Sequence, residues 1–460
     1  MKRWDIMTDS NANRADEKRK EEQSPASRRE FIKGSSMLLA GGAIPGSIPL
    51  RPKLQRMEAE PIRVGLIGCG VRGTALALQA LNPLHGDVRL VAVGDVFEDR
   101  LQQAMRTLRS GPHRDRIEVG AQRRCVGLEA YRKVLESDAD LIILAAPPGF
   151  RPLHFAAAVA AGKHVFAEKP VAIDAPGVRH FLATCQAATD RKLAVAVGLQ
   201  RRHEPAYQAT IAKLQSGAIG RINFCRAYWN QGLSWSRPRA KQHTELEYQL
   251  RNWGYFNWLS GDHIVEQHVH NLDVINWLLG DHPERAQGVG GRQVRAGAAF
   301  GQVYDHHTVE FTYPRGVKLL SMCRQMPNCW NTVGEFAHGS EGWADIAAGK
   351  IFDLDNRLLW QADEIRQGHA GELESLFASL RSGEVPNEGQ YAAASTLTAI
   401  MGRMATYSGK EVTWVQCLNS QLSLGDTSLL SSLHDASPCQ PNASGNYEVV
   451  QPGGEDSKVF

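Results

Sequence analysis

Residues 61–73 read Pro-Ile-Arg-Val-Gly-Leu-Ile-Gly-Cys-Gly-Val-Arg-Gly, and a helical pattern follows over residues 74–81. A short β-type run therefore passes directly into a Gly-x-Gly-x-x-Gly motif that opens a helix. In such a motif the first glycine permits a tight turn, the second lets the backbone approach a pyrophosphate, and the third allows helix and strand to pack closely. The stretch predicts a dinucleotide-binding Rossmann domain whose helix N-terminus faces the phosphates. The expected loop contacts are Gly68, Gly70, Val71, Arg72 and Gly73.

Asp95 ends the next strand-like run, residues 89–94, and lies 22 residues beyond Gly73. A carboxylate at this point accepts hydrogen bonds from both ribose hydroxyls and repels a 2′-phosphate, so NAD is the expected cofactor. NADP stays open, because Arg72 or Arg100 could accommodate the phosphate. The alternative is a Rossmann-like domain with a degenerate nucleotide site, which the complete set of glycines disfavours.

Glu168 and Lys169 follow a further strand-like run, residues 163–167, and precede Pro170. The run before it, residues 140–146, reads as a buried parallel strand. In an open α/β sheet, ligands bind beyond the carboxyl ends of the strands, which is where this order places Lys169. The alternative for the charged pair is a solvated loop.

The Glu-Lys-Pro at residues 168–170 resembles the hallmark of the Gfo/Idh/MocA oxidoreductases, and the resemblance runs from Pro61 to about Asn419. It implies a Rossmann domain followed by an α+β domain. It also implies that Lys169 is a catalytic residue near the hydroxyl being oxidised. Glu168 and Lys169 would border the bound cofactor as well.

A second motif of the same family is a helix that reads roughly Asp-x-Gly-x-His-x-x-Asp and supplies an acid/base histidine with an acidic partner. His270 and Asp273 match it, whereas Glu266 stands in place of the aspartate and His268 in place of the glycine. The resemblance implies that His270 and Glu266 are catalytic. The two departures leave the substrate open.

The spacing around this motif also favours acid/base chemistry. Glu266 and His270 are four residues apart and His263 precedes Glu266 by three, so a continuous helix would place all three on one face. A histidine can accept the alcohol proton as hydride leaves the carbon, and Lys169 can stabilise the developing alkoxide. The same face could bind a divalent metal, but the chemistry needs none and none is expected. A structural role is an equal alternative for His263 and His268.

Substrate contacts are expected from the second domain. Arg201 follows the last strand of the first domain, residues 193–199, and Trp229 belongs to aromatic and amide-rich runs that continue at residues 251–258. Sugars stack on such rings, although core or dimer-interface packing explains them equally well. For Arg201 the alternative is a structural link between domains. The expected contacts are Arg201, Trp229, His263 and Asp273.

The patterns divide the chain into a signal and linker at 1–60, the Rossmann domain at 61–200, an α+β substrate and oligomerisation domain at 201–419, and a low-complexity tail at 420–460. Strand-like runs in the third segment fit the open, mostly antiparallel sheet that the resemblance implies. The exposed face of that sheet often pairs with another subunit in the family, so a homo-oligomer is expected. The Ser/Gly/Pro-rich tail is either disordered or a surface strap.

Ser27-Arg28-Arg29-Glu30-Phe31-Ile32-Lys33, followed by a weakly apolar stretch, resembles a twin-arginine signal. It implies a periplasmic or otherwise exported protein, with the export machinery as a partner. A basic tail with a chance arginine pair is the alternative. No run reaches the roughly 18 apolar residues of a transmembrane helix, so no stable membrane insertion is expected.

Composition excludes other classes of function. The 52 basic residues are interspersed with 49 acidic ones, for a net charge of +3, which disfavours nucleic-acid binding. The eight cysteines are scattered with no CxxC pair, so they indicate neither a zinc ribbon nor a disulfide scaffold.

The family resemblance implies hydride transfer between a nicotinamide and a hydroxyl of a sugar, cyclitol or glycoside. Because free NAD is scarce outside the cytoplasm, the cofactor is expected to stay bound and to be regenerated on the protein. Oxidation of one sugar with reduction of another would achieve this. Transient oxidation that activates elimination of a glycosidic bond, followed by re-reduction, would achieve it too, which would make the chain an NAD-dependent glycosidase. A cofactor-bearing binding protein without turnover is disfavoured by Lys169 and His270.

Overall fold

A computed structural model describes residues 60–232, 235–363 and 371–454. The twin-arginine segment lies outside these residues. Within the described part of the chain, no helix is both long enough and apolar enough to cross a membrane.

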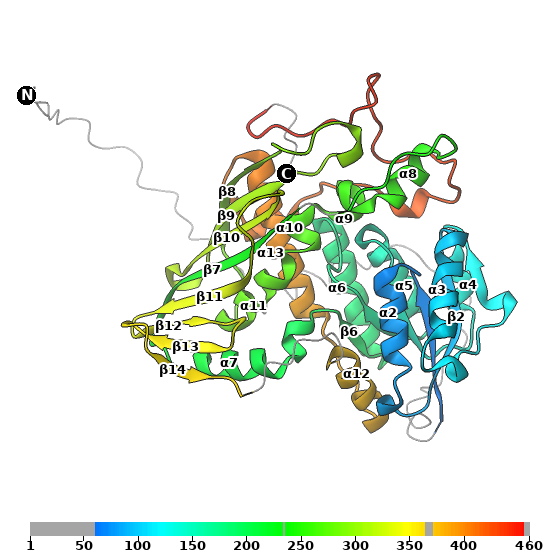
Figure 1. Cartoon of the computed structure of the whole chain (residues 1–460), viewed down its shortest axis with the longest axis horizontal. Coiled ribbons are helices and arrows are strands. Elements are labelled where there is room, and N and C mark those ends of the chain that lie inside the picture. Colours follow the sequence, from blue (N-terminus) through cyan, green and yellow to red (C-terminus); the bar gives the residue numbers. More distant parts are fainter. Residues whose placement is uncertain (1–59, 233–234, 364–370, 455–460) are drawn as a thin grey trace, which may run out of the picture. The chain divides into compact units, whose positions relative to one another are not determined.

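The first domain is built on a six-stranded parallel sheet with the order β3-β2-β1-β4-β5-β6 (Figure 1). Its strands are β1 (Ile62–Ile67), β2 (Val88–Asp95), β3 (Arg124–Val126), β4 (Leu141–Leu144), β5 (His164–Ala167) and β6 (Val195–Val197). The connecting helices are α2 (Val71–Ala80), α3 (Glu98–Ser110), α4 (Ala130–Leu135), α5 (Arg151–Ala160) and α6 (Ala175–Asp190). This strand order is the doubly wound arrangement that binds dinucleotides, as the glycine motif predicts.

The second domain contains a nine-stranded sheet with the order β14-β13-β12-β11-β7-β10-β9-β8-β15. Its strands are β7 (Ile222–Gln231), β8 (Arg285–Gly291), β9 (His306–Thr312), β10 (Lys318–Gln325), β11 (Thr332–Gly339), β12 (Gly342–Asp345), β13 (Lys350–Asp353), β14 (Leu358–Gln361) and β15 (Val412–Thr413). Neighbours pair antiparallel except for β7 and β10, which pair parallel. The prediction of an open, mostly antiparallel sheet is confirmed.

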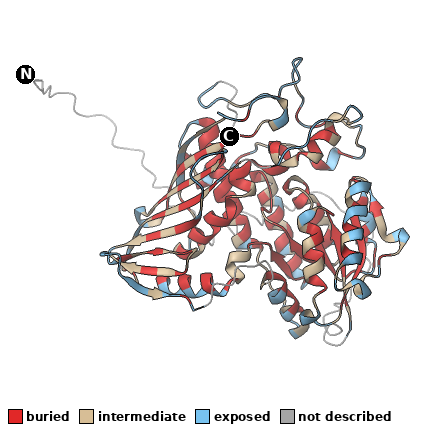
Figure 2. Cartoon of the chain, viewed as in Figure 1, coloured by how far each residue is buried: buried red, intermediate tan, exposed pale blue. Residues whose placement is uncertain are grey.

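Helices cover one face of the large sheet. α11 (Val269–Leu279) packs on β7 and β11, and α13 (Gly389–Ser408) packs on β8 and β9 and also contacts α6 of the first domain. Along β10 every second residue is buried, as expected for a sheet with one covered face. Figure 2 shows the burial concentrated in the parallel sheet and in the helices between the two sheets.

Further helices complete the structure. They are α7 (Pro205–Gln215), α8 (Glu245–Arg251), α9 (Asn257–Ser260), α10 (His263–Glu266), α12 (Gly371–Ser382) and α14 (Trp414–Asn419). Although α12 comes late in the chain, its apolar residues belong to the core of the Rossmann domain with the side chains of α2 and β1. The first domain therefore includes a helix that the sequence boundaries assign to the second.

The described part of the C-terminal tail, residues 420–454, lies against the protein. Leu430, Cys439 and Tyr447 are buried in an apolar cluster with Tyr248 and Trp258. Of the two alternatives for this tail, the structure supports the strap and not disorder.

The prediction of one continuous helix through His263, Glu266 and His270 is wrong. Helix α10 ends at Glu266 and α11 begins at Val269. Gln267 interrupts the run with φ −109° and ψ −51°. The three side chains therefore do not share one helical face.

Candidate active site

A cavity of about 840 Å³ lies at the carboxyl ends of β1, β2, β4 and β5. Its lining contains both the predicted cofactor contacts and the predicted catalytic side chains, namely Gly68, Gly70, Val71, Arg72, Gly73, Asp95, Glu168, Lys169, Glu266 and His270. The structure thus brings together residues from both domains around one space.

The glycine loop has the shape that a pyrophosphate requires. Gly68 has a φ of 99°, and a Cβ at Gly73 would lie 1.9 Å from the carbonyl oxygen of Gly68. A Cβ at Gly70 would meet no atom within 4 Å, so this backbone faces open space. Gly70 is the N-cap of α2 and provides no side-chain hydrogen bond, which leaves the first N–H groups of the helix for an anion. The loop therefore fits a dinucleotide.

Asp95 both lines the cavity and fixes the loop. Its carboxylate accepts hydrogen bonds from the backbone N–H of Cys69 at 2.7 Å and of Phe97 at 2.9 Å. Burial raises the pKa of Asp95. A carboxylate has about four lone-pair sites, so the two backbone bonds leave capacity for ribose hydroxyls.

Arg72 lies between two carboxylates. It donates to Glu168 at 2.6 Å and to Glu372 of α12 at 2.6 Å. Burial, followed by the charge of Glu168, raises the pKa of Glu372 to about 8. Glu372 is not predictable from the sequence, because it lies 300 residues from Arg72 and belongs to no motif.

Lys169 is held by the second domain. Its Nζ donates to the backbone oxygen of Glu266 at 2.6 Å and to the Glu266 carboxylate at 3.0 Å. Arg151 supports the same region by donating to the carbonyl oxygens of Pro170 at 2.7 Å and Ala146 at 2.6 Å. The ammonium group of Lys169 is therefore fixed at the cavity wall by a carboxylate, an arrangement that can stabilise a developing alkoxide.

His270 enters the cavity from α11. Its ring stacks on Trp229 with 5.9 Å between centroids, and the Arg201 guanidinium lies 5.6 Å from the Trp229 ring. Arg201 also forms an ion pair with the fully buried Glu335. Trp229 and Arg201 do not belong to the cavity lining. Trp229 packs against the His270 ring, and Arg201 packs against Trp229. Direct contact of either residue with a substrate stays a prediction.

Asp273 and His263 lie away from the cavity lining, contrary to the expectation of substrate contact. The Asp273 carboxylate is buried, binds Arg202 at 2.8 to 3.0 Å, and accepts from Ser395 at 2.8 Å. It connects α11 to the segment after β6. In this structure the aspartate that matches the family motif forms an ion pair that joins two segments of the chain.

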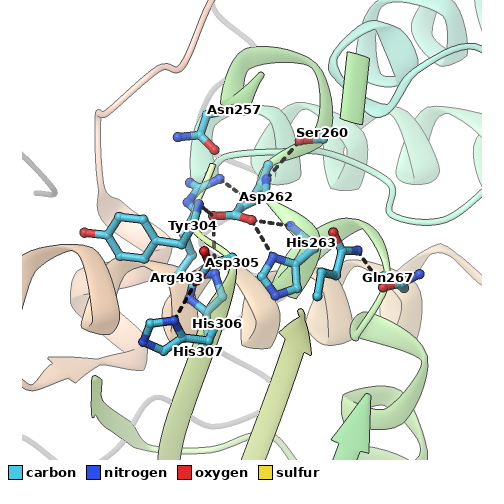
Figure 3. A network of polar contacts seen from close by, with 12 residues as sticks. Asn257, Ser260, Asp262, His263, Gln267, Tyr304, Asp305, His306, His307 and Arg403 are labelled. Atoms are coloured by element: carbon cyan, nitrogen blue, oxygen red, sulfur yellow. Dashed lines mark hydrogen bonds and ion pairs between the residues drawn. The ribbon is translucent and has the colours of Figure 1, made fainter. Parts of the chain in front are cut away.

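His263 belongs to a buried network around Asp262 (Figure 3). Asp262 Oδ1 lies 2.8 Å from His263 Nδ1, and Oδ2 lies 3.2 Å from His307 Nε2. Oδ2 also accepts from the Tyr407 hydroxyl at 2.7 Å and the Tyr304 backbone at 3.0 Å. Burial alone would raise the pKa of Asp262, but His307 and His263 hold it well below its usual range.

Among the described residues, the candidate metal-binding group consists of Asp262, His263 and His307. It is not the group that the sequence suggested, His263 with Glu266 and His270. The atoms of Asp262, His263 and His307 lie within 4.8 Å of one another. The hydrogen bonds on both carboxylate oxygens already satisfy Asp262. The network connects α10 to the large sheet and so fixes the segment that carries Glu266.

Comparisons with known proteins agree with this architecture. The sequence model described as "Oxidoreductase family, NAD-binding Rossmann fold" (GFO_IDH_MocA) matches residues 62–199, and that described as "GFO/IDH/MocA C-terminal domain" matches residues 207–344.

Curated relatives match about a third of the chain. The inositol 2-dehydrogenase of Pseudomonas syringae pv. syringae is 31% identical over 159 residues, which are 35% of this chain and 43% of the relative. The dTDP-3,4-didehydro-2,6-dideoxy-alpha-D-glucose 3-reductase of Actinomadura kijaniata is 29% identical over 168 residues, which are 36% of this chain and 44% of the relative. The chain thus spans less than half the length of these relatives.

Solved structures share the fold over a longer range. A levoglucosan dehydrogenase in complex with NADH and levoglucosan aligns with a TM-score of 0.60 at 16% identity, over 77% of this chain and 99% of that one. The aldose-aldose oxidoreductase of Caulobacter crescentus aligns with a TM-score of 0.60 at 16% identity, over 77% and 100% of the two chains. Together the two matching sequence models cover more than half of the 460 residues, and the chain belongs to the Gfo/Idh/MocA oxidoreductase family.

Proposed function

We propose that this chain is an NAD-dependent oxidoreductase that transfers a hydride between a nicotinamide and a hydroxyl of a sugar, cyclitol or glycoside. One observation carries the proposal: the phosphate loop and the side chains Lys169, Glu266 and His270 line the same cavity. A protein that only stored a dinucleotide would not need a fixed ammonium group and an imidazole beside it.

The side chains have distinct tasks in this proposal. Gly70 and the N-terminus of α2 hold the pyrophosphate, and Asp95 holds the ribose of the adenosine half. The nicotinamide supplies the hydride acceptor when it is bound. His270 takes the proton of the substrate hydroxyl, and Lys169, fixed by Glu266, stabilises the oxygen as negative charge develops. Trp229 limits the movement of the His270 ring by stacking on it.

The names of the relatives support a cyclic polyol or sugar substrate. They include inositol 2-dehydrogenases, a dTDP-sugar reductase and a levoglucosan dehydrogenase. The test is a screen of the purified protein against cyclitols, free sugars and aryl glycosides, recording cofactor absorbance and leaving-group release together. Cofactor reduction without release supports the dehydrogenase, and release without net reduction supports the glycosidase. Neither signal with any substrate, from protein that binds NADH, would contradict the proposal.

We also propose that the chain is exported by its twin-arginine segment and keeps its cofactor bound. The arginine pair at 28–29 and the apolar residues behind it support this. Arg28→Lys combined with Arg29→Lys should leave the protein in the cytoplasm. Arg51→Lys combined with Arg56→Lys is the matched control and should be exported normally. Periplasmic recovery of the first variant at the level of the control would contradict export by this route.

A homo-oligomer formed through the large sheet is a further proposal. On the face of β10 away from the helices, Leu320 and Met322 are partly exposed, and β8, two strands away, adds the exposed Val289 on the same face. Met322→Glu should reduce the mass measured by light scattering, because a buried charge in the interface is costly. An unchanged mass above that of a monomer would place the interface elsewhere.

A further inference from the structure

The cavity has a second wall, to which the aromatic run at residues 251–258 contributes Arg251 and Trp253. Trp235, Arg237, Arg251 and Trp253 line it from the segment that runs through α8. They border the same cavity as Arg100, which follows the Asp95 loop at the start of α3. In a Rossmann domain the acid after the second strand holds the adenosine ribose. This wall therefore stands at the adenosine half of the cofactor site.

The wall is attached to the first domain by Arg251. Its guanidinium donates to both oxygens of Asp99 at 3.1 Å and lies 3.9 Å from the centre of the Phe97 ring. Asp99 and Phe97 belong to the segment that follows Asp95. The second domain thus contacts the first directly beside the ribose-binding carboxylate.

Two arginines face the cavity here without the carboxylate partners that Arg251 has. Within the described residues, neither Arg100 nor Arg237 forms an ion pair with an acidic side chain. Arg237 lies over the Trp235 ring at 5.5 Å, and Trp235 is 47% exposed. Guanidinium and indole planes both stack on flat heteroaromatic rings. An adenine ring is the part of the cofactor with that chemistry.

The wall is fixed from behind by buried groups. The side chain of Asn252, which is 1% exposed, accepts from the Arg237 backbone N–H at 2.7 Å and donates to the Arg237 carbonyl oxygen at 3.2 Å. On α8, Gln249 donates to the carbonyl oxygen of Cys439 at 2.6 Å. Tyr447 packs edge-on against Phe256 at 4.9 Å. The C-terminal strap therefore holds the wall in place.

We propose that Trp235 and Arg237 bind the adenine ring of NAD(H) against the Rossmann domain, and that the strap of residues 420–454 braces this wall so that the cofactor leaves slowly. The proposal rests on the proposed function for the identity of the dinucleotide. It gives a structural basis for a cofactor that stays on the protein between turnovers.

The test measures cofactor release and needs no substrate. Full-length protein loaded with NADH is mixed with a large excess of NAD⁺, and the loss of NADH fluorescence gives the release rate. Because stacking on one base contributes about 1–3 kcal/mol, Trp235→Ala and Arg237→Ala should each release NADH about 5- to 150-fold faster. Tyr447→Ala removes the packing of the strap on Phe256 and its hydroxyl bonds with Arg239 and Glu245, and it should speed release without changing a residue of the cavity lining.

Matched controls are Trp330→Ala and Arg357→Ala, whose side chains are exposed and lie outside the cavity lining. They should release NADH at the wild-type rate. Wild-type release by both Trp235→Ala and Arg237→Ala would overturn the inference. So would a loss of NADPH but not NADH binding in Arg237→Ala, because the arginine would then serve a 2′-phosphate. Slow NADH release by a protein that oxidises no sugar would instead contradict the proposed function and leave the wall intact.

Discussion

Gly70→Ala and Gly73→Ala should separate cofactor binding from folding within one loop. A Cβ at Gly73 would lie 1.9 Å from the Gly68 carbonyl oxygen, so the start of α2 would have to move away from the loop. Overpacking of this kind costs about 1–3 kcal/mol. A Cβ at Gly70 would meet no protein atom within 4 Å, and Gly70 has an ordinary φ of −70°. The stability of Gly70→Ala should therefore fall by less than about 1 kcal/mol, the effect of a poorer N-cap.

The cost of the methyl group at Gly70 should appear when the dinucleotide binds, because it occupies the space that the pyrophosphate approaches. A displacement worth about 1.4–3 kcal/mol would weaken NADH binding about 10- to 100-fold. The melting temperature and an NADH fluorescence titration measure the two effects separately. Gly254→Ala, whose Cβ also meets no atom within 4 Å but which lies outside the cavity lining, is the control. Wild-type NADH affinity in Gly70→Ala, or wild-type stability in Gly73→Ala, would refute this account of the loop.

Three further predictions test other parts of the molecule. Lys169→Met and His270→Ala should each lower the rate of single-turnover reduction of bound NAD by about 10²- to 10⁴-fold, while the affinity for NADH is retained. Wild-type rates in both variants would show that neither side chain takes part in the reaction. Asp95→Ala should weaken NADH binding and narrow the preference for NAD over NADP, and an unchanged preference in titrations would contradict the ribose assignment. Burial lowers the pKa of His154 and of His268 to about 3. Below about pH 6.5 the folded state therefore binds fewer protons than the unfolded state. The free energy of unfolding should be greatest above this pH and should fall by about 1.4 kcal/mol per pH unit below it for each histidine. Equal melting temperatures at pH 7 and pH 5 would contradict this.

The parts of the fold that the sequence predicts are those with local causes. The glycine loop needs particular backbone angles and close approaches, so three glycines and the flanking apolar runs define the first strand, turn and helix together. Lys169 is predictable for a similar reason, because any residue directly after a buried parallel strand lies at the ligand-binding edge of the sheet. Its partner Glu266 was predicted as well, although from the family resemblance and not from the sheet.

The missed features depend on contacts between distant segments. Glu372 reaches Arg72 only because α12 returns to the Rossmann core, and nothing near residue 372 indicates this. The break between α10 and α11 was missed because the spacing of charged residues there fits a helix, whereas tertiary bonds determine the actual path. In particular, Asp262 has a φ of 72° and is held by partners on β9 and α13. The Ser/Gly/Pro-rich composition of the tail likewise gave no sign of Tyr447 packing on Phe256.

The two departures from the family helix have different consequences in the structure. His268 replaces a glycine, yet its ring is fully buried and its Nε2 lies 2.8 Å from the Ser321 hydroxyl on β10, so it fills a space between helix and sheet. It cannot select the substrate by contact. Glu266 lines the cavity and binds Lys169 through its carboxylate as well as its backbone oxygen. A side chain longer than aspartate by one methylene sets where the ammonium group is held. The change at 266 therefore acts on the reacting centre, and substrate selection must come from other parts of the cavity wall.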